Sequence, residues 1–159
     1  MKKYLVILTV MFVFNGFSQE SLPNVNVKDL KNKTINISRE YTEKDKIYVF
    51  SFWATWCVPC IRELEAINEK YEDWSEELNM ELIAISTDDS RTQKRVRPLV
   101  NGKNWPYEIL LDENQELKRA LSIVNIPYTV VVKNKKIKHI VNGYSQGAEE
   151  ELYDMLKTL

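Results

Sequence analysis

A buried-strand pattern that ends in a cysteine pair and continues into a helix constrains this chain most. The apolar run IYVFSFW, from Ile47 to Trp53, is typical of a strand covered on both faces. Cys57 and Cys60 follow within WATWCVPC, and they are the only cysteines in the 159 residues. From Ile61 to Leu78, large apolar residues recur at spacings of three and four, which predicts an amphipathic helix. Pro59 suits its first turn. This order predicts that Cys57 lies at the helix N-terminus.

A helix N-terminus favours an anion, because its first N–H groups lack partners and the macrodipole is positive there. For Cys57 the anion is the thiolate, and the usual cysteine pKa of about 8.5 can fall to about 3.5–7.5 in such a motif. Cys60 lies on the same helical face and can attack a mixed disulfide formed at Cys57. We therefore interpret Cys57 as the nucleophile and Cys60 as the resolving thiol. Glu63 continues this row and can relay the proton of Cys60, although a solvated surface carboxylate is the alternative.

Two other uses of the cysteines need more partners than the sequence offers. A structural zinc site takes four ligands, and the chain has two cysteines and one histidine, His139. His139 lies in an alternating segment, so we expect an ordinary strand side chain. A Cys–His hydrolase would need His139 as its base and a third, orienting group. We expect no metal, and no cofactor beyond a redox-active Cys57–Cys60 disulfide.

The first eighteen residues have the pattern of a secretory signal peptide. Lys2 and Lys3 precede an apolar run from Tyr4 to Phe14, and the small residues Gly16 and Ser18 precede a cut after Ser18. The 11 residues of the run are fewer than the roughly 20 that a membrane helix needs. We expect a single mature domain over residues 19–159, exported to the periplasm or another extracytoplasmic space. An uncleaved membrane anchor is the alternative.

Export would place the cysteines where disulfides form and persist. A bridge across two intervening residues closes a very short loop and gives little stabilisation by chain entropy. The pair is therefore expected to react rather than to stabilise the fold.

A net charge of −1 and a pI of about 6.0 argue against nucleic acid as a partner.

The rest of the chain alternates between predicted strands and helices, without repeats. Strands are predicted at 24–27 and 34–37, as a hairpin, and at 80–86, 109–111, 128–132 and 136–142. Helices are predicted over 90–100 and 115–123, and at the C-terminus on Leu152, Met155, Leu156 and Leu159. Parallel units followed by a hairpin and a closing helix predict an α/β fold, with a mixed sheet flanked by helices.

Three stretches resemble the thioredoxin fold, and more narrowly the TlpA/ResA-like extracytoplasmic thiol–disulfide oxidoreductases. They are FWATWCVPC from Phe52, NIPYTVVVKNKKI from Asn125 and SLPNVNVKDLKNKTINI from Ser21, and the resemblance covers roughly residues 21–159. It implies a thioredoxin fold with an N-terminal β-hairpin and a cis peptide bond before Pro127, which faces the cysteines. It also matches Glu63 to a family glutamate. The expected substrate groove comprises Trp56, Pro59, Ile126 and Pro127.

Three positions depart from the pattern. Ser51 stands where cytoplasmic thioredoxins carry a buried aspartate six residues before the first cysteine, which gives Glu63 more weight as proton acceptor. Tyr128 follows Pro127 where threonine is usual. The pair Val58-Pro59 lacks the histidine of strongly oxidising relatives, which favours a reductant.

These observations predict an enzyme that reduces protein disulfides outside the cytoplasm. The resemblance implies a membrane thiol-reductant donor and a possible role in cytochrome c maturation. One alternative is a dithiol oxidase or stress-response redox protein, although the peroxidatic Pro-x-x-x-Thr-x-x-Cys pattern is absent around Cys57. Another is a non-catalytic thioredoxin-like module that binds a metal or a partner. The sequence indicates no oligomeric state.

Overall fold

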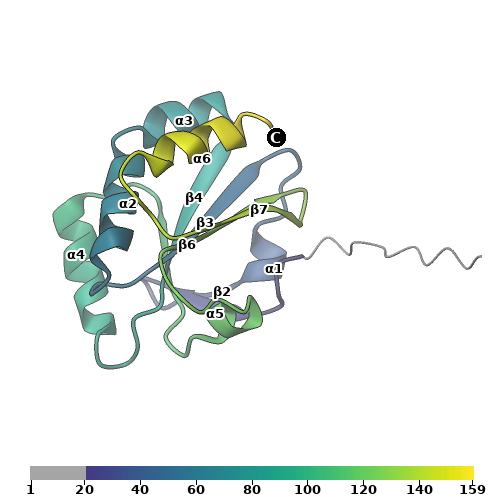
Figure 1. The fold of residues 1–159 in the computed structure, drawn as a ribbon. Coiled ribbons are helices and arrows are strands. Elements are labelled where there is room, and N and C mark those ends of the chain that lie inside the picture. The colour runs from purple at the N-terminus through teal and green to yellow at the C-terminus, as the bar shows by residue number, and fades with distance from the viewer. Residues whose placement is uncertain (1–20) are drawn as a thin grey trace, which may run out of the picture.

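The computed structural model describes residues 21–159, and a mixed sheet runs through them (Figure 1). The sheet has the strand order β2-β1-β5-β4-β3-β6-β7. Its strands in this described part are β1 (Asn26–Asp29), β2 (Thr34–Asn36), β3 (Ile47–Trp53), β4 (Met80–Ser86), β5 (Glu108–Leu111), β6 (Tyr128–Lys133) and β7 (Lys136–Asn142). Strands β3, β4 and β5 are parallel, whereas β6, β7 and the β1–β2 hairpin pair antiparallel. The predicted signal peptide, residues 1–18, lies outside the described residues.

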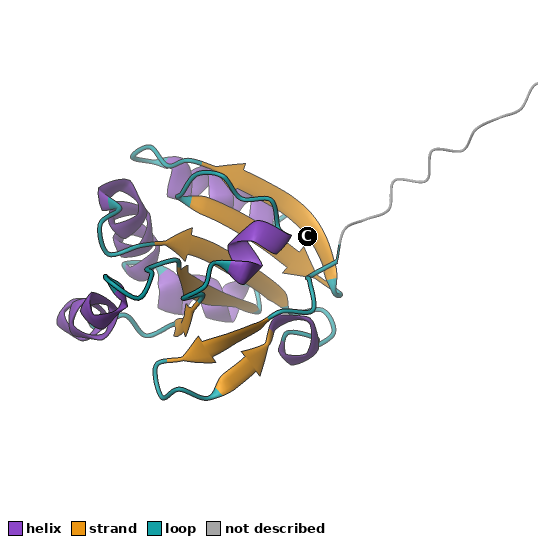
Figure 2. Ribbon diagram, turned by 90° about the horizontal axis from the view of Figure 1, so that it is seen from below, coloured by secondary structure: helices purple, strands orange, loops and turns teal. Residues whose placement is uncertain are grey.

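Helices cover both faces of this sheet (Figure 2). They are α1 (Ile37–Glu40), α2 (Val58–Asn68), α3 (Tyr71–Glu77), the 3₁₀ helix η1 (Gln93–Arg95), α4 (Val96–Lys103), α5 (Glu116–Ala120) and α6 (Ala148–Leu156). One core cluster contains apolar residues of α2, α3, α4 and α6, and the other contains those of α1 and α5. In Figure 1, α3 and α6 accordingly lie above the sheet and α1 and α5 below it.

Strand β3 explains how the two cores share one sheet. All seven of its residues are buried, as the continuous apolar run predicts. Ile47, Val49 and Trp53 lie in the core under α2, while Tyr48, Phe50 and Phe52 lie in the opposite core. This is the two-residue period of a strand. The same alternation points Ser51, between Val49 and Trp53, toward α2.

The expected α/β architecture is confirmed, including the N-terminal hairpin, and β3, β4 and β7 have the predicted bounds. The helix predicted from Ile61 to Leu78 is wrong as a single element. It is broken at Glu69 and Lys70, and the φ of −122° at Lys70 is not helical. Leu64, Ile67 and Trp74 still reach the same core, because the break preserves the apolar spacing.

Smaller differences concern helix lengths. The segment predicted as a helix over 90–100 contains η1 followed by α4, and α5 is shorter than the predicted 115–123. Gln115 has a left-handed φ of 55°, which excludes it from α5. The short helix α1 was not predicted. Within residues 21–159, no helix is both long enough and apolar enough to cross a membrane.

Candidate active site

The two cysteines lie where β3 passes into α2, as predicted. Cys57 is the N-cap residue of α2, and its backbone N–H donates to the carbonyl of Ala54 at 3.0 Å. Pro59 occupies the first turn, where its missing N–H costs no helical hydrogen bond. Cys57 and Cys60 form a disulfide with their Cα atoms 5.3 Å apart. Cys57 is 5% exposed and Cys60 is fully buried, so Cys57 is the more accessible residue of the pair.

Glu63 is buried one turn beyond Cys60, which excludes the solvated carboxylate considered from the sequence. Its carboxyl accepts a hydrogen bond from Ser51 Oγ at 3.2 Å and another from Thr129 Oγ1 at 3.1 Å. The two donors are direct cross-strand partners, Ser51 in β3 and Thr129 in β6. Both side chains therefore emerge on the face of the sheet that α2 covers, and Glu63 lies between them and the helix.

Burial raises the pKa of Glu63 from its usual 4.5 to about 7, against the hydrogen bonds from Thr129 and Ser51, which lower it. A low-dielectric environment disfavours the charged carboxylate. A carboxyl with a pKa near 7 can both accept and return a proton at neutral pH. Glu63 lies on the same row as Cys57 and Cys60, and its proton-relay role stays a prediction.

The structure also brings the expected substrate-groove residues to this end of the sheet. The Ile126–Pro127 peptide bond is cis, as the resemblance implied. Tyr128 pairs with Phe52, so the Pro127 loop adjoins the end of β3 from which Cys57 emerges. Trp56, next to Cys57 in the chain, is 58% exposed, and Val58 on its other side is exposed as well. These two side chains place exposed apolar surface beside the cysteine pair.

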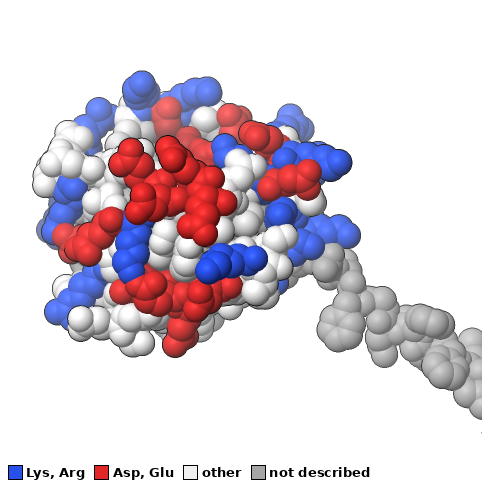
Figure 3. Space-filling model, turned by 90° about the horizontal axis from the view of Figure 1, so that it is seen from above, with Lys and Arg blue, Asp and Glu red and all other residues white. Residues whose placement is uncertain are grey.

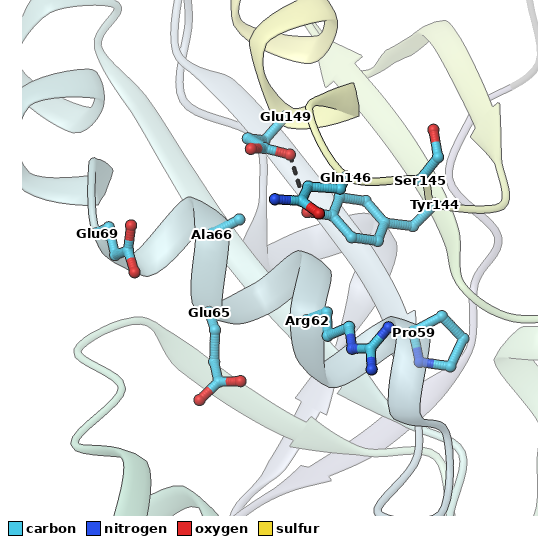
Figure 4. A pocket seen from close by; sticks show the side chains of 9 residues that line it. All are labelled: Pro59, Arg62, Glu65, Ala66, Glu69, Tyr144, Ser145, Gln146 and Glu149. Carbon is cyan, nitrogen blue, oxygen red and sulfur yellow. Dashed lines mark hydrogen bonds between the residues drawn. The ribbon is translucent and has the colours of Figure 1, made fainter.

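A groove of about 610 Å³ extends from Pro59 along the outer side of α2 to the segment before α6 (Figure 4). Arg62 lines it from α2 and Glu69 from the residue that follows this helix, and Tyr144 and Glu149 line it from the other side. The Tyr144 hydroxyl donates to Glu149 at 2.9 Å, as Figure 4 shows. The neighbouring face is rich in Asp and Glu (Figure 3), with acidic residues on α3 and α6: Glu72, Asp73, Glu76, Glu77, Glu149, Glu150, Glu151 and Asp154.

His139 lies in β7, at the edge of the sheet, and pairs with Val131 of β6. Within the described residues 21–159, no group of three or more His, Cys, Asp or Glu side chains could hold a metal ion.

Sequence reasoning missed one member of the Glu63 site, Thr129. It reads as a polar residue within the strand YTVVV, and its role depends on the pairing of β6 with β3. The signal that could have found it is its position two residues after Pro127. A strand that begins at Tyr128 points Thr129 to the same face as Val131, which is the face under α2.

Comparison with known proteins gives concordant results. The sequence model of the AhpC/TSA family matches residues 19–140. The thiol-disulfide oxidoreductase ResA of Bacillus thuringiensis subsp. konkukian is 28% identical over 138 residues, which cover 86% of this chain and 75% of that protein.

Solved structures share the fold. A thioredoxin-like protein from Porphyromonas gingivalis, described as uncharacterized, has a TM-score of 0.76 at 40% identity, over 87% of this chain and 90% of that one. A putative thiol:disulfide interchange protein DsbE from Chlorobium tepidum has a TM-score of 0.75 at 13% identity, over 88% of this chain and 95% of that one. The expected thioredoxin-like fold is therefore confirmed.

Proposed function

This chain belongs to the AhpC/TSA family, and from that premise we propose that it is a thiol–disulfide oxidoreductase of the ResA type that reduces protein disulfides. The observation that carries the proposal is the Cys57–Cys60 disulfide at the N-terminus of α2, with Glu63 buried on the same helix. The ResA relative bears the name of the same reaction class.

The proposed reaction moves two electrons from the dithiol to the substrate. The Cys57 thiolate attacks one sulfur of the substrate disulfide, which forms a mixed disulfide and releases one substrate thiolate. Cys60 then transfers its proton to the Glu63 carboxylate and attacks the Cys57 sulfur. The Cys57–Cys60 disulfide forms, and the second substrate thiolate leaves. An external dithiol donor must then reduce the disulfide before another cycle.

We further propose that the reaction takes place outside the cytoplasmic membrane. The signal-peptide pattern of residues 1–18 supports export. The TlpA/ResA resemblance supports a membrane thiol carrier as donor and cytochrome c maturation as the process served. Because the peroxidatic pattern is absent around Cys57, we do not propose hydrogen peroxide as the substrate.

The insulin-reduction assay with dithiothreitol tests the core of the proposal on residues 19–159. The wild-type chain should accelerate precipitation of the insulin B chain, and Cys57→Ser should abolish the acceleration. Cys60→Ser should instead accumulate a mixed disulfide, visible by mass spectrometry under non-reducing conditions. Full activity of Cys57→Ser, or an inactive wild-type chain, would contradict the proposal.

The direction of electron flow has its own measurement, the equilibrium of the Cys57–Cys60 couple with glutathione. We propose the reducing direction because Val58-Pro59 supplies no histidine to stabilise the thiolate. A potential near that of thioredoxin, about −270 mV, would agree with this direction. A value near about −120 mV, as for a strong oxidant, would favour the dithiol oxidase alternative.

A further inference from the structure

The turn that delivers Cys57 is tied to the end of a neighbouring strand. The carbonyl of Trp53 accepts hydrogen bonds from Thr87 N at 2.8 Å and from Thr87 Oγ1 at 3.1 Å. Two residues further along the turn, Thr55 donates twice to the carboxyl of Asp88. Its backbone N lies 2.8 Å from Asp88 Oδ2 and its Oγ1 lies 2.6 Å from Asp88 Oδ1. The segment just after β4 is therefore hydrogen-bonded to this turn at two positions, Trp53 and Thr55.

Asp88 is a buried carboxyl that the proposed reaction does not use. It is 1% exposed, and its third donor is Ser86 Oγ at 2.9 Å. None of the ion pairs found within residues 21–159 involves Asp88. A buried carboxylate without a cationic partner depends on its hydrogen bonds, and loss of one donor leaves it poorly compensated. The bonds to Thr55 therefore favour one arrangement of the turn.

That arrangement matters for the nucleophile, since Thr55 is two residues before Cys57. Cys57 is the N-cap residue, and its side chain makes no capping hydrogen bond. The stabilisation of an anion at a helix N-terminus falls off within the first turn. A turn that moved would carry the Cys57 sulfur away from the free N–H groups of α2.

We propose that Asp88 is a positioning residue for Cys57, because its hydrogen bonds from the backbone N–H and hydroxyl of Thr55 hold the nucleophile at the N-terminus of α2. This role rests on the proposed function, in which Cys57 reacts as a thiolate. Asp88 itself touches no reacting atom in the proposed cycle. Its contribution is to the ionisation and reactivity of the thiol.

The test is the pH dependence of Cys57 alkylation by iodoacetamide, measured in a Cys60→Ser background so that one thiol reports. Thr55→Val keeps the charge of Asp88 and removes its side-chain bond to the turn, so it should raise the alkylation midpoint by half a pH unit or more, which lowers the alkylation rate at pH 7 about threefold. Asp88→Asn weakens the same contacts but also removes a negative charge, which by itself would lower the midpoint, so Thr55→Val is the deciding variant. Thr55→Ser keeps the hydroxyl and should restore the wild-type profile.

Asp112→Asn is the matched control. Asp112 is 3% exposed, follows β5 as Asp88 follows β4, and accepts hydrogen bonds from the backbone N–H groups of Leu117 and Lys118. Its replacement should lower the melting temperature without moving the alkylation profile. The charged residues next to Cys60 on α2, Arg62 and Glu63, stay in every variant.

The proposal is overturned if Asp88→Asn and Thr55→Val melt earlier while the alkylation profile stays that of the parent, since Asp88 would then be only structural. It is also overturned if Thr55→Val does not move the profile, or if Asp112→Asn moves it as far as Thr55→Val. Should Asp88→Asn fail to fold, Thr55→Val decides alone. The readout needs no substrate turnover, so failure of this inference and failure of the proposed function in the insulin assay are distinguishable.

Discussion

Ser51 donates a hydrogen bond of 3.2 Å to the carboxyl of Glu63, from the position that the resemblance matches to the buried aspartate of cytoplasmic thioredoxins. Thr129 donates from the other side of Glu63, at 3.1 Å. The acid near the cysteines thus has two neutral donors around it. Desolvation, rather than repulsion from a second carboxylate, is the main cause of its raised pKa.

Glu63→Gln should change how folding stability depends on pH. The folded-state pKa of about 7 exceeds the usual 4.5, so the folded protein binds this proton more tightly than the unfolded chain does. The stability contributed by protonated Glu63 is complete below about pH 4.5, falls as pH rises toward 7 and is lost above it. Glu63→Gln has no such carboxyl, so it does not lose stability in this way. Its free energy of unfolding relative to wild type should rise by up to about 3 kcal/mol between pH 4.5 and 8.

Denaturant unfolding of the oxidised proteins at pH 5 and pH 8 measures this difference, because the disulfide keeps the cysteines from titrating. Glu65→Gln is the control, on the outer side of the same helix and paired with Lys103. A stability difference between Glu63→Gln and wild type that does not change with pH would show that Glu63 ionises in the fold as readily as in the unfolded chain.

Thr129→Val should raise the pKa of Glu63 above its wild-type value, because the Thr129 hydrogen bond lowers it. Less Glu63 is then ionised at pH 7 and able to accept the proton of Cys60. Release of substrate from the mixed disulfide should slow roughly threefold at pH 7 and recover at higher pH. Stopped-flow measurement of product release from pH 6 to 9 checks this.

Ser51→Ala should also raise the pKa of Glu63, and so shift the pH profile of product release toward higher pH. The control is Thr34→Val, at an exposed position of edge strand β2. If the Thr129→Val and Ser51→Ala profiles both coincide with that of the control, the hydroxyls do not tune Glu63.

Tyr41→Phe should destabilise the protein by about 1–3 kcal/mol, because it removes the hydroxyl that donates to Glu108 Oε2 at 2.8 Å. Burial raises the pKa of Glu108 and this hydrogen bond lowers it, so the variant should favour the protonated carboxyl. The loss of stability should therefore be larger at pH 8 than at pH 5. The packing of the ring against Tyr48 and Phe50 is retained.

Urea unfolding at the two pH values tests this prediction. Tyr48→Phe is the matched control, since its hydroxyl accepts only one hydrogen bond, from Glu43 N at 3.3 Å. Equal losses in the two variants, without a pH effect, would contradict a specific role for the Glu108 contact.

The mature chain should begin at Gln19 when the full sequence is expressed in a bacterium with an export pathway. Signal peptidase acts after small residues such as Ser18. Intact mass and N-terminal sequencing of the protein from the extracytoplasmic fraction measure the cut. Recovery of the uncut chain from membranes would support the anchor alternative. Expression of residues 19–159 alone, which should stay in the cytoplasm, is the control.

Local patterns predicted where the cysteines lie in the fold. The apolar run from Ile47 to Trp53 is long enough to define β3, and Pro59 defines the start of α2. Cys57 and Cys60 therefore take their places through interactions close in sequence. The sequence pattern does not indicate the break at Glu69, because the apolar spacing of α2 continues in phase into α3.

Contacts between distant segments were not predictable in the same way. Thr129 reaches Glu63 through the antiparallel register of β6 on β3, which depends on pairing between residues far apart in the sequence. In the sequence, Asp88 is one of two adjacent acidic residues after β4. Only the folded structure, in which Asp88 is buried against Thr55, distinguishes its role from that of Asp89. Spacing along the chain carries no information on such partners.

The described chain starts at a bridge between Ser21 and Lys136, beside the end of β7 that pairs with Lys133. Lys133 is opposite Ile47, at the start of β3, whereas Cys57 follows the other end of that strand. The seven residues of β3 span roughly 20 Å. A tether, tag or surface attached through Ser21 would therefore hold the domain at the end of the sheet opposite to the cysteines. The dithiol would stay accessible at the other end.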